Sequence, residues 1–162
     1  MARSSTERED GFKVVFDLDR EEDWPPVERE GVWAEALGEG EYRLDNVPWF
    51  ARNVAYGDRV WAEPDAEGVL KVRERLEWSG RYTIRVIPLG GGRPEAQLQD
   101  VIDTFSALGA ECESALPAFK IVALDIPPTA SLGEIKSLLI EGEAAGQWSY
   151  EEGCIDETWS AL

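Results

Sequence analysis

The sequence contains no histidine and only two cysteines among its 162 residues. Without histidine, the commonest general base near neutral pH is missing, and so is every Ser-His-Asp or Cys-His catalytic arrangement. Zinc and iron sites that include an imidazole are also excluded, and two thiols are too few for a four-thiolate zinc site or iron–sulfur cluster. Carboxylates, lysine, tyrosine, a lone cysteine and arginine remain as catalytic options. The composition therefore favours a non-catalytic protein without a metal or cofactor.

Long hydrophobic runs are also absent. No apolar stretch approaches the roughly 18 residues that a transmembrane helix needs. The first ten residues, MARSSTERED, lack the hydrophobic segment of a signal peptide. We therefore expect a cytoplasmic protein without membrane association, in which Cys112 and Cys154 stay reduced. Because residues 1–10 are polar and show no apolar periodicity, we expect them to form a disordered leader.

Positive charge is scarce, since 16 Lys and Arg residues stand against 33 Asp and Glu residues, for a formal net charge of −17. The excess is spread along the chain, with 11 basic against 20 acidic residues in 1–80 and 5 against 13 in 81–162. Such a surface repels nucleic-acid phosphates and anionic lipids, so it disfavours both and favours a basic protein partner. Simple solubility explains the same charge, and the sequence leaves both explanations open.

Apolar and aromatic residues are plentiful, at 43% hydrophobic content with seven tryptophans, which is enough for a core. Within residues 11–80, short segments of alternating apolar and polar residues predict a small antiparallel β-barrel or bent sheet. The predicted strands are residues 12–18, 31–37, 41–44, 58–64 and 69–78. We expect Trp33 and Trp61, which lie within alternating strands, to pack in the barrel core.

Residues 81–155 show a different pattern, in which two segments of helical periodicity alternate with strands. The first predicted helix ends at Gly109, and Ser131 followed by Glu134 predicts a capping box for the second. The order β-α-β-β-α-β predicts a ferredoxin-like unit, with residues 156–162 as a C-terminal tail. In the strand order usual for such folds, Cys112 and Cys154 fall on opposite edge strands, too far apart for a disulfide. The expected fold class is therefore α+β.

Residues 30–63 form an aromatic-rich block with three recognisable motifs. These are the strand VWAE at 32–35, the turn DNVPWFA at 45–51 and the strand YGDRV at 56–60. In them the chain resembles the bacterial family called domain of unknown function 4265, and the likeness extends less distinctly from about Val14 to Gly153. The family has no established activity, so the resemblance implies no substrate, cofactor or partner.

The residues of these motifs have an ordinary structural explanation. Asn46 is expected to cap a short helical turn, opened by Pro48, that carries Trp49 and Phe50 toward the core. We favour a turn-shaping role for Asp45, Asn46, Tyr56, Gly57 and Asp58, because such residues are common in turns. Trp49, Tyr56 and Asp58 remain candidates for binding.

The acidic loop 17–23 and the adjacent Trp24 form the leading candidate site. We expect Trp24 to be exposed, and a tryptophan rimmed by Glu21, Glu22 and Asp23 suits an interface with a basic protein. The spaced carboxylates resemble the start of a calcium loop, but the central glycine and final bidentate glutamate of an EF-hand are missing. A solvated connector is therefore favoured over a metal site.

Three functions are compatible with these features. The leading hypothesis is a non-catalytic acidic protein that binds a basic protein partner, and an immunity or antitoxin-type protein is one form of it. The alternative is a small-molecule-binding sensor or regulatory domain, because ferredoxin-like units recur in ligand-binding regulators. The third is a histidine-free enzyme that uses a carboxylate such as Asp58 or Glu35 with Tyr56 and Arg59. A monomer and a homodimer are both compatible with the sequence.

Overall fold

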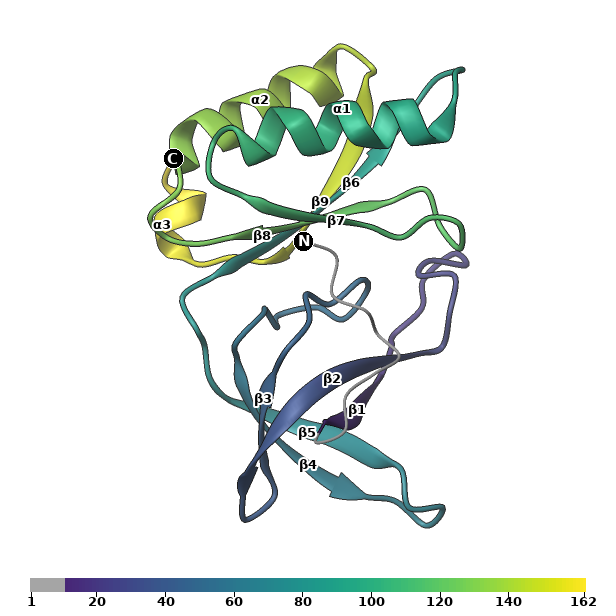
Figure 1. Cartoon of the computed structure of the whole chain (residues 1–162), viewed down its shortest axis with the longest axis vertical. Coiled ribbons are helices and arrows are strands. Elements are labelled where there is room, and N and C mark those ends of the chain that lie inside the picture. The colour runs from purple at the N-terminus through teal and green to yellow at the C-terminus, as the bar shows by residue number, and fades with distance from the viewer. Residues whose placement is uncertain (1–10) are drawn as a thin grey trace. The chain divides into compact units, whose positions relative to one another are not determined.

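The computed structural model describes residues 11–162, and the chain divides into two compact units, residues 1–79 and 80–162. Each unit has its own β-sheet (Figure 1). The disordered leader expected at residues 1–10 lies outside the described residues. None of the helices within residues 11–162 is long and apolar enough to cross a membrane.

The first unit is a closed barrel with the strand order β1-β2-β3-β4-β5. Its strands are β1 (Phe12–Asp17), β2 (Arg29–Gly38), β3 (Glu41–Leu44), β4 (Arg59–Pro64) and β5 (Leu70–Glu77). Successive strands pair antiparallel, and β1 closes the barrel by a parallel bridge of Val15 to Lys71 on β5. The predicted N-terminal barrel is therefore confirmed.

Small and branched apolar side chains fill the barrel interior. They include Val14, Val32, Ala34, Leu44, Val60 and Ala62. Because side chains alternate along a strand, Trp33 and Trp61 project from the opposite face. Trp33 is half-buried, and Trp61 is 40% exposed. The prediction that both indoles pack in the core is wrong, because the interior of a five-stranded barrel holds valine and alanine better than two indoles.

The second unit contains a four-stranded sheet in the order β7-β8-β6-β9, in which every neighbouring pair is antiparallel. Its strands are β6 (Tyr82–Pro88), β7 (Glu111–Ser114), β8 (Val122–Ile126) and β9 (Trp148–Cys154). Helices α1 (Pro94–Ser106) and α2 (Leu132–Ala144) lie side by side over one face of this sheet (Figure 1). Along the chain the elements run β6-α1-β7-β8-α2-β9, and α3 (Glu157–Ser160) follows. The α+β class is confirmed by these elements.

The helices of the second unit pack through the apolar positions that the periodicity indicates. The buried residues are Leu98, Val101 and Phe105 of α1 and Ile135 and Leu139 of α2. The predicted capping box is wrong, because the Ser131 side chain makes no capping hydrogen bond. Its backbone N–H donates to the Leu108 carbonyl, and its ψ of 71° departs from the extended conformation usual for a side-chain cap.

The C-terminal residues 156–162, expected as a tail, contain α3 instead. The Asp156 carboxylate caps this helix by accepting a hydrogen bond from the Trp159 N–H at 3.0 Å. Trp159 is fully buried and packs against Tyr82, with ring centroids 5.4 Å apart. The segment is ordered because the indole belongs to the core of the second unit.

The two thiols lie on the two edge strands of the second sheet. Cys112 is on β7 and Cys154 is on β9, with β8 and β6 between them. Three strand spacings separate the edges by roughly 14 Å, which is beyond the reach of a disulfide. The expected placement of the two cysteines is confirmed.

Candidate functional site

A cleft of about 980 Å³ lies between the β1–β2 connection and the β3–β4 connection of the barrel. Its apolar lining consists of Phe16, Leu18, Trp24, Pro25, Phe50 and Ala51. Its polar lining consists of Asp17, Asp19, Glu21, Glu22, Arg52 and Asn53. Four carboxylates and one guanidinium thus surround an aromatic surface, an arrangement that suits a cationic ligand with apolar parts.

Trp24 belongs to the apolar wall of the cleft. Its backbone forms a two-bond bridge with Glu21, since the Glu21 N–H donates to the Trp24 carbonyl at 2.8 Å and the Trp24 N–H donates to the Glu21 carbonyl at 2.9 Å. The indole meets the Phe50 ring edge to face, with centroids 5.9 Å apart. Trp24 is half-buried, so the expectation of an exposed tryptophan is wrong. The reason is that a second loop, contributing Phe50, packs against it.

The loops around the cleft contain unusual backbone conformations. Glu22, Asp23 and Asn53 have φ angles of 50°, 65° and 61°. Residues other than glycine seldom adopt such left-handed conformations. Within residues 11–162 only one other non-glycine residue has a positive φ, Glu39 in the β2–β3 turn. Conformations of this kind cluster at functional sites, so their presence in both loops supports the cleft as the candidate site.

The second wall of the cleft is held by Glu30, a residue of β2 that is 7% exposed. Its Oε2 accepts a hydrogen bond from the Trp49 N–H at 2.5 Å. Its Oε1 accepts hydrogen bonds from the N–H groups of Phe50 and Ala51, at 3.1 and 3.0 Å. Residues 46–50 form no helical turn, so the prediction of a turn capped by Asn46 is wrong. The carboxylate of a distant strand satisfies the backbone there, and Phe50 and Ala51 are buried as a result.

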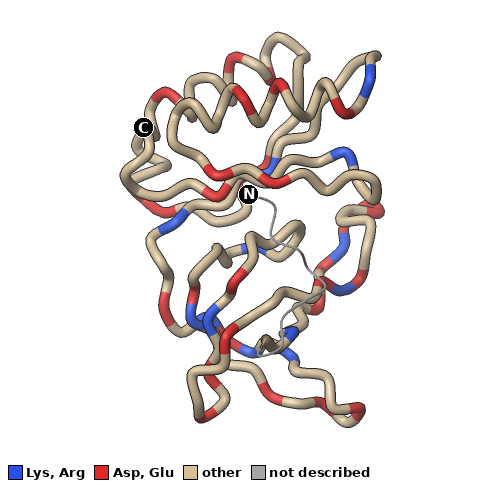
Figure 2. Tube along the Cα trace, viewed as in Figure 1, with Lys and Arg blue, Asp and Glu red and all other residues tan. Residues whose placement is uncertain are grey.

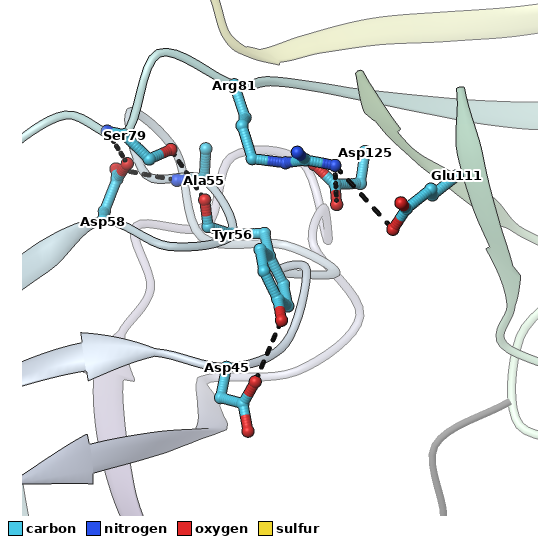
Figure 3. Close-up of polar contacts among 8 residues, drawn as sticks. All are labelled: Asp45, Ala55, Tyr56, Asp58, Ser79, Arg81, Glu111 and Asp125. Carbon is cyan, nitrogen blue, oxygen red and sulfur yellow. Dashed lines mark hydrogen bonds and ion pairs between the residues drawn. The ribbon is translucent and has the colours of Figure 1, made fainter. Parts of the chain in front are cut away.

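Two further carboxylates hold the rest of the β3–β4 connection (Figure 3). The Tyr56 hydroxyl donates to Asp45 Oδ1 at 3.0 Å. The fully buried Asp58 accepts hydrogen bonds from the N–H groups of Ala55 at 2.9 Å and Ser79 at 2.8 Å. Burial raises the pKa of Asp58, and the hydrogen bonds from Ser79 and Ala55 oppose that rise. These side chains are engaged in holding the loop.

The structure distributes the seven binding candidates over three environments. Trp24, Glu21 and Glu22 line the cleft, and Asp23 is exposed beside it. Trp49 is half-buried next to the cleft wall without lining the cleft, while Tyr56 and Asp58 lie in the hydrogen bonds of the loop.

The four side chains considered for proton transfer do not share one site. Arg59 pairs with Glu41 at 2.9 Å and with Glu77 at 4.0 Å. Glu35 is exposed on β2, and Tyr56 and Asp58 have the loop partners described above. None of the four lines the cleft.

Within residues 11–162, no three Asp, Glu or Cys side chains converge to hold a metal ion. Burial raises the pKa of the Cys112 thiol to about 11, against a hydrogen bond from Ser106 that lowers it. A thiol with such a pKa is a poor nucleophile near neutral pH.

The second unit has buried or half-buried arginines that form charge pairs of their own. Arg81 binds Asp125 through two hydrogen bonds of 2.7 and 2.9 Å (Figure 3). Arg85, which is 1% exposed, donates from Nε to Glu151 at 2.5 Å. Arg81 directly precedes β6 and binds Asp125 of β8, while Arg85 of β6 binds Glu151 of β9, so both contacts join neighbouring parts of the sheet.

Sequence reasoning missed Glu30, although a signal was present. Glu30, Val32 and Ala34 are spaced two residues apart on β2, and all three are buried. A carboxylate in the inward register of a predicted strand needs hydrogen-bond donors, because burying an unpaired charge is costly. Phe50 and Arg52 were missed for another reason, since only the folded loop brings them to Trp24.

Comparison with known proteins agrees with this architecture. The chain is similar to a hypothetical protein from Neisseria gonorrhoeae, with a TM-score of 0.68 and 22% identity over 91% of this chain and 96% of that chain. At that identity the likeness shows the fold alone. No curated protein matches the sequence. The profile of domain of unknown function 4265 matches residues 30–150, a range that begins at Glu30 and contains all three motifs. The chain therefore belongs to the family called domain of unknown function 4265.

Proposed function

We propose that the protein is a non-catalytic binding protein whose acidic cleft engages a basic protein partner. One observation carries the proposal, namely that a single cleft joins the aromatic wall of Trp24 and Phe50 to four carboxylates. Apolar anchors in a partly enclosed site supply affinity, while surrounding charges steer the partner and set specificity.

The chemistry of the cleft favours arginine as the partner's contact residue. A guanidinium stacks on an aromatic face and at the same time forms paired hydrogen bonds with a carboxylate. Trp24 offers the aromatic surface, and Glu21 and Glu22 follow one another in the same loop. The net charge of −17 adds long-range attraction for any basic protein, and this part weakens as salt rises.

A small cationic molecule is the second candidate ligand, as expected of a sensor or regulatory domain. The observation that favours it is the volume of the cleft, about 980 Å³, which is within the range of roughly 300–1,000 Å³ usual for small-molecule sites. A rise in melting temperature with a cationic metabolite, lost in Trp24→Ala, supports this candidate.

We also propose a fold class for the second unit and a cellular compartment for the protein. The strand order β7-β8-β6-β9, with helices after β6 and β8, supports a ferredoxin-like class for the second unit. We propose that the interaction takes place in the cytoplasm, because the sequence shows no signal-peptide segment and no long apolar run. An immunity or antitoxin-type protein directed against a basic toxin is one form of this function.

The test is purification of the tagged protein from its own host, with mass spectrometry of proteins that bind at low salt and leave at high salt. We expect a stoichiometric basic protein that is lost with the double variant Glu21→Lys, Glu22→Lys and with Trp24→Ala. The matched control is Asp100→Lys, Glu141→Lys, which makes the same charge change at exposed positions of α1 and α2. Equal loss with both double variants, or no basic protein at all, contradicts the proposal.

A further inference from the structure

We propose that Glu30 is a positioning residue, which prepares the cleft for its ligand by fixing the wall formed by Phe50 and Ala51. The inference rests on the proposed function of the cleft and names the interaction that gives this site its shape. It does not require Glu30 to touch the ligand, and Glu30 is not among the residues that line the cleft.

The geometry is that of an anion site occupied by the protein's own carboxylate. Three successive backbone N–H groups, from Trp49 to Ala51, converge on the two oxygens of Glu30 at 2.5 to 3.2 Å. Successive N–H groups that point to one place form a concave site for an anion. Because the carboxylate belongs to β2, the bonds tie this irregular segment to a strand of the barrel. We call these hydrogen bonds from residues 49–51 to Glu30 the Glu30 clamp.

A carboxylate supplies the two acceptor oxygens that this segment needs. The peptide groups of residues 49–51 belong to no helix or strand, so their N–H groups need acceptors. A glutamine at position 30 has the same size but a single acceptor oxygen, and its NH₂ group would face N–H donors. Glu30→Gln therefore loses the hydrogen bonds of one of the two oxygens and places a donor against the backbone N–H groups, while it changes side-chain volume very little.

The hydrogen bonds of Glu30 affect the cleft because the residues that they fix also line it. Phe50 and Ala51, whose N–H groups are clamped, line the cleft themselves, and Arg52 and Asn53 extend the same wall. The Phe50 ring also supports Trp24 edge to face. A site that is ordered before binding avoids the entropy cost of ordering during binding. Releasing the clamp should therefore weaken binding even though every lining residue is still present.

Asp65 provides a matched control within the same barrel. Its Oδ1 accepts hydrogen bonds from the N–H groups of Glu67 and Val69, both at 2.9 Å, in the β4–β5 turn. Asp65 does not line the cleft. Asp65→Asn thus makes the same carboxylate-to-amide change and removes the same charge, while its one amide oxygen can still accept both hydrogen bonds.

The experiment measures the Kd of a fluorescein-labelled nona-arginine peptide in 150 mM NaCl for the full-length wild type, Glu30→Gln, Asp65→Asn and the double variant Glu21→Gln, Glu22→Gln. Circular dichroism fixes a temperature at which every variant is folded. We expect about a tenfold higher Kd for Glu30→Gln and less than about a twofold change for Asp65→Asn. Amide hydrogen exchange should accelerate at residues 49–51 in Glu30→Gln only.

The outcomes separate this inference from the proposed function. If the cleft double variant loses binding but Glu30→Gln matches Asp65→Asn, the positioning role is wrong and the proposed function stands. If the wild type does not bind the peptide, the proposed function is contradicted. If amide exchange at residues 49–51 is the same in Glu30→Gln as in the wild type, the structural role of Glu30 is also wrong. If Glu30→Gln does not fold, Glu30→Asp replaces it, because it keeps the charge but shortens the reach.

Discussion

The described residues of the two units carry equal net charge and use it in different ways. Residues 11–79 contain 9 basic and 17 acidic residues, and residues 80–162 contain 5 and 13, so each has a net charge of −8. In the barrel, carboxylates of Glu30, Asp58 and Asp65 accept hydrogen bonds from loop N–H groups. In the second unit, six of the 13 acidic residues occupy exposed positions of α1 and α2, along which Figure 2 marks acidic residues in red. They are Glu95, Asp100, Asp103, Glu134, Glu141 and Glu143.

The difference follows from how each unit satisfies its backbone. A helix bonds its own peptide groups, so the acidic residues of α1 and α2 are available to solvent. The long β3–β4 connection has no such internal ladder, so side chains must supply acceptors. Acidic residues therefore hold the loops beside the cleft in the barrel, whereas those of α1 and α2 in the second unit face solvent.

The largest expected effect tests the claim that the second unit depends on its apolar core. Trp159→Ala removes a fully buried indole and its Nε1–H bond to the Glu152 carboxylate, so we expect a loss of about 3–5 kcal/mol in the stability of that unit. Hydrogen exchange resolved by residue should show the loss in residues 80–162. Thr158→Ala, at an exposed position of α3, is the control. Equal loss in both variants would break the comparison.

The next effect concerns a buried carboxylate of the barrel. Asp58→Asn places an amide NH₂ near the N–H groups of Ala55 and Ser79, for an expected cost of about 1–3 kcal/mol. Because burial raises the folded-state pKa of Asp58 above 3.8, the folded state binds its proton at higher pH than the unfolded state does. The wild-type advantage over Asp58→Asn is therefore fully present below pH 3.8 and declines as pH rises through the folded pKa.

Urea unfolding of both proteins between pH 3 and 7, followed in the barrel by hydrogen exchange, measures this difference. Glu67→Gln, at an exposed position of the β4–β5 turn, serves as the control for loss of one charge. A wild-type advantage that grows with pH would show that hydrogen bonds outweigh burial at Asp58.

The smallest effect has the opposite pH dependence. Lys71 is 5% exposed and donates to the exposed Asp17 at 2.5 Å. This hydrogen bond lowers the pKa of Asp17 below 3.8, so the pair stabilises the barrel above that pH and the stabilisation is lost as pH falls through the folded pKa. Lys71→Met should flatten the acid side of the stability profile, measured by urea midpoints. Arg43→Gln, at an exposed position of β3, should leave the profile unchanged, and an identical flattening there would refute the specific pairing.

The accuracy of sequence-based reasoning differed between the units for a physical reason. Helical periodicity predicted the two helices of the second unit, whose buried residues include Leu98 and Phe105, because a helix repeats its buried face within a few residues. Alternation found the barrel strands, but it could not tell which of the two faces is inside. Trp61 was placed inside although Val60 and Ala62 occupy the interior, since a shift of one residue exchanges the faces of a strand.

The candidate site was predictable only in part. The acidic loop around Trp24 could be found from its composition, because charge and aromatic content are local properties of the sequence. The opposite wall, from Phe50 to Asn53, carried no signal that linked it to that loop. Glu30 could be recognised as an inward carboxylate, but its donors follow it by 19 to 21 positions.

By itself, the sequence determined the excluded chemistries, the strongly acidic character, the two kinds of periodicity and the family. These follow from residue types and short spacings, which need no knowledge of distant contacts. The tertiary structure alone decided which faces point inward, how β1 closes the barrel on β5, and which two loops form the cleft. Those features depend on pairings between residues far apart in the chain, and the pairings exist only once the barrel has closed.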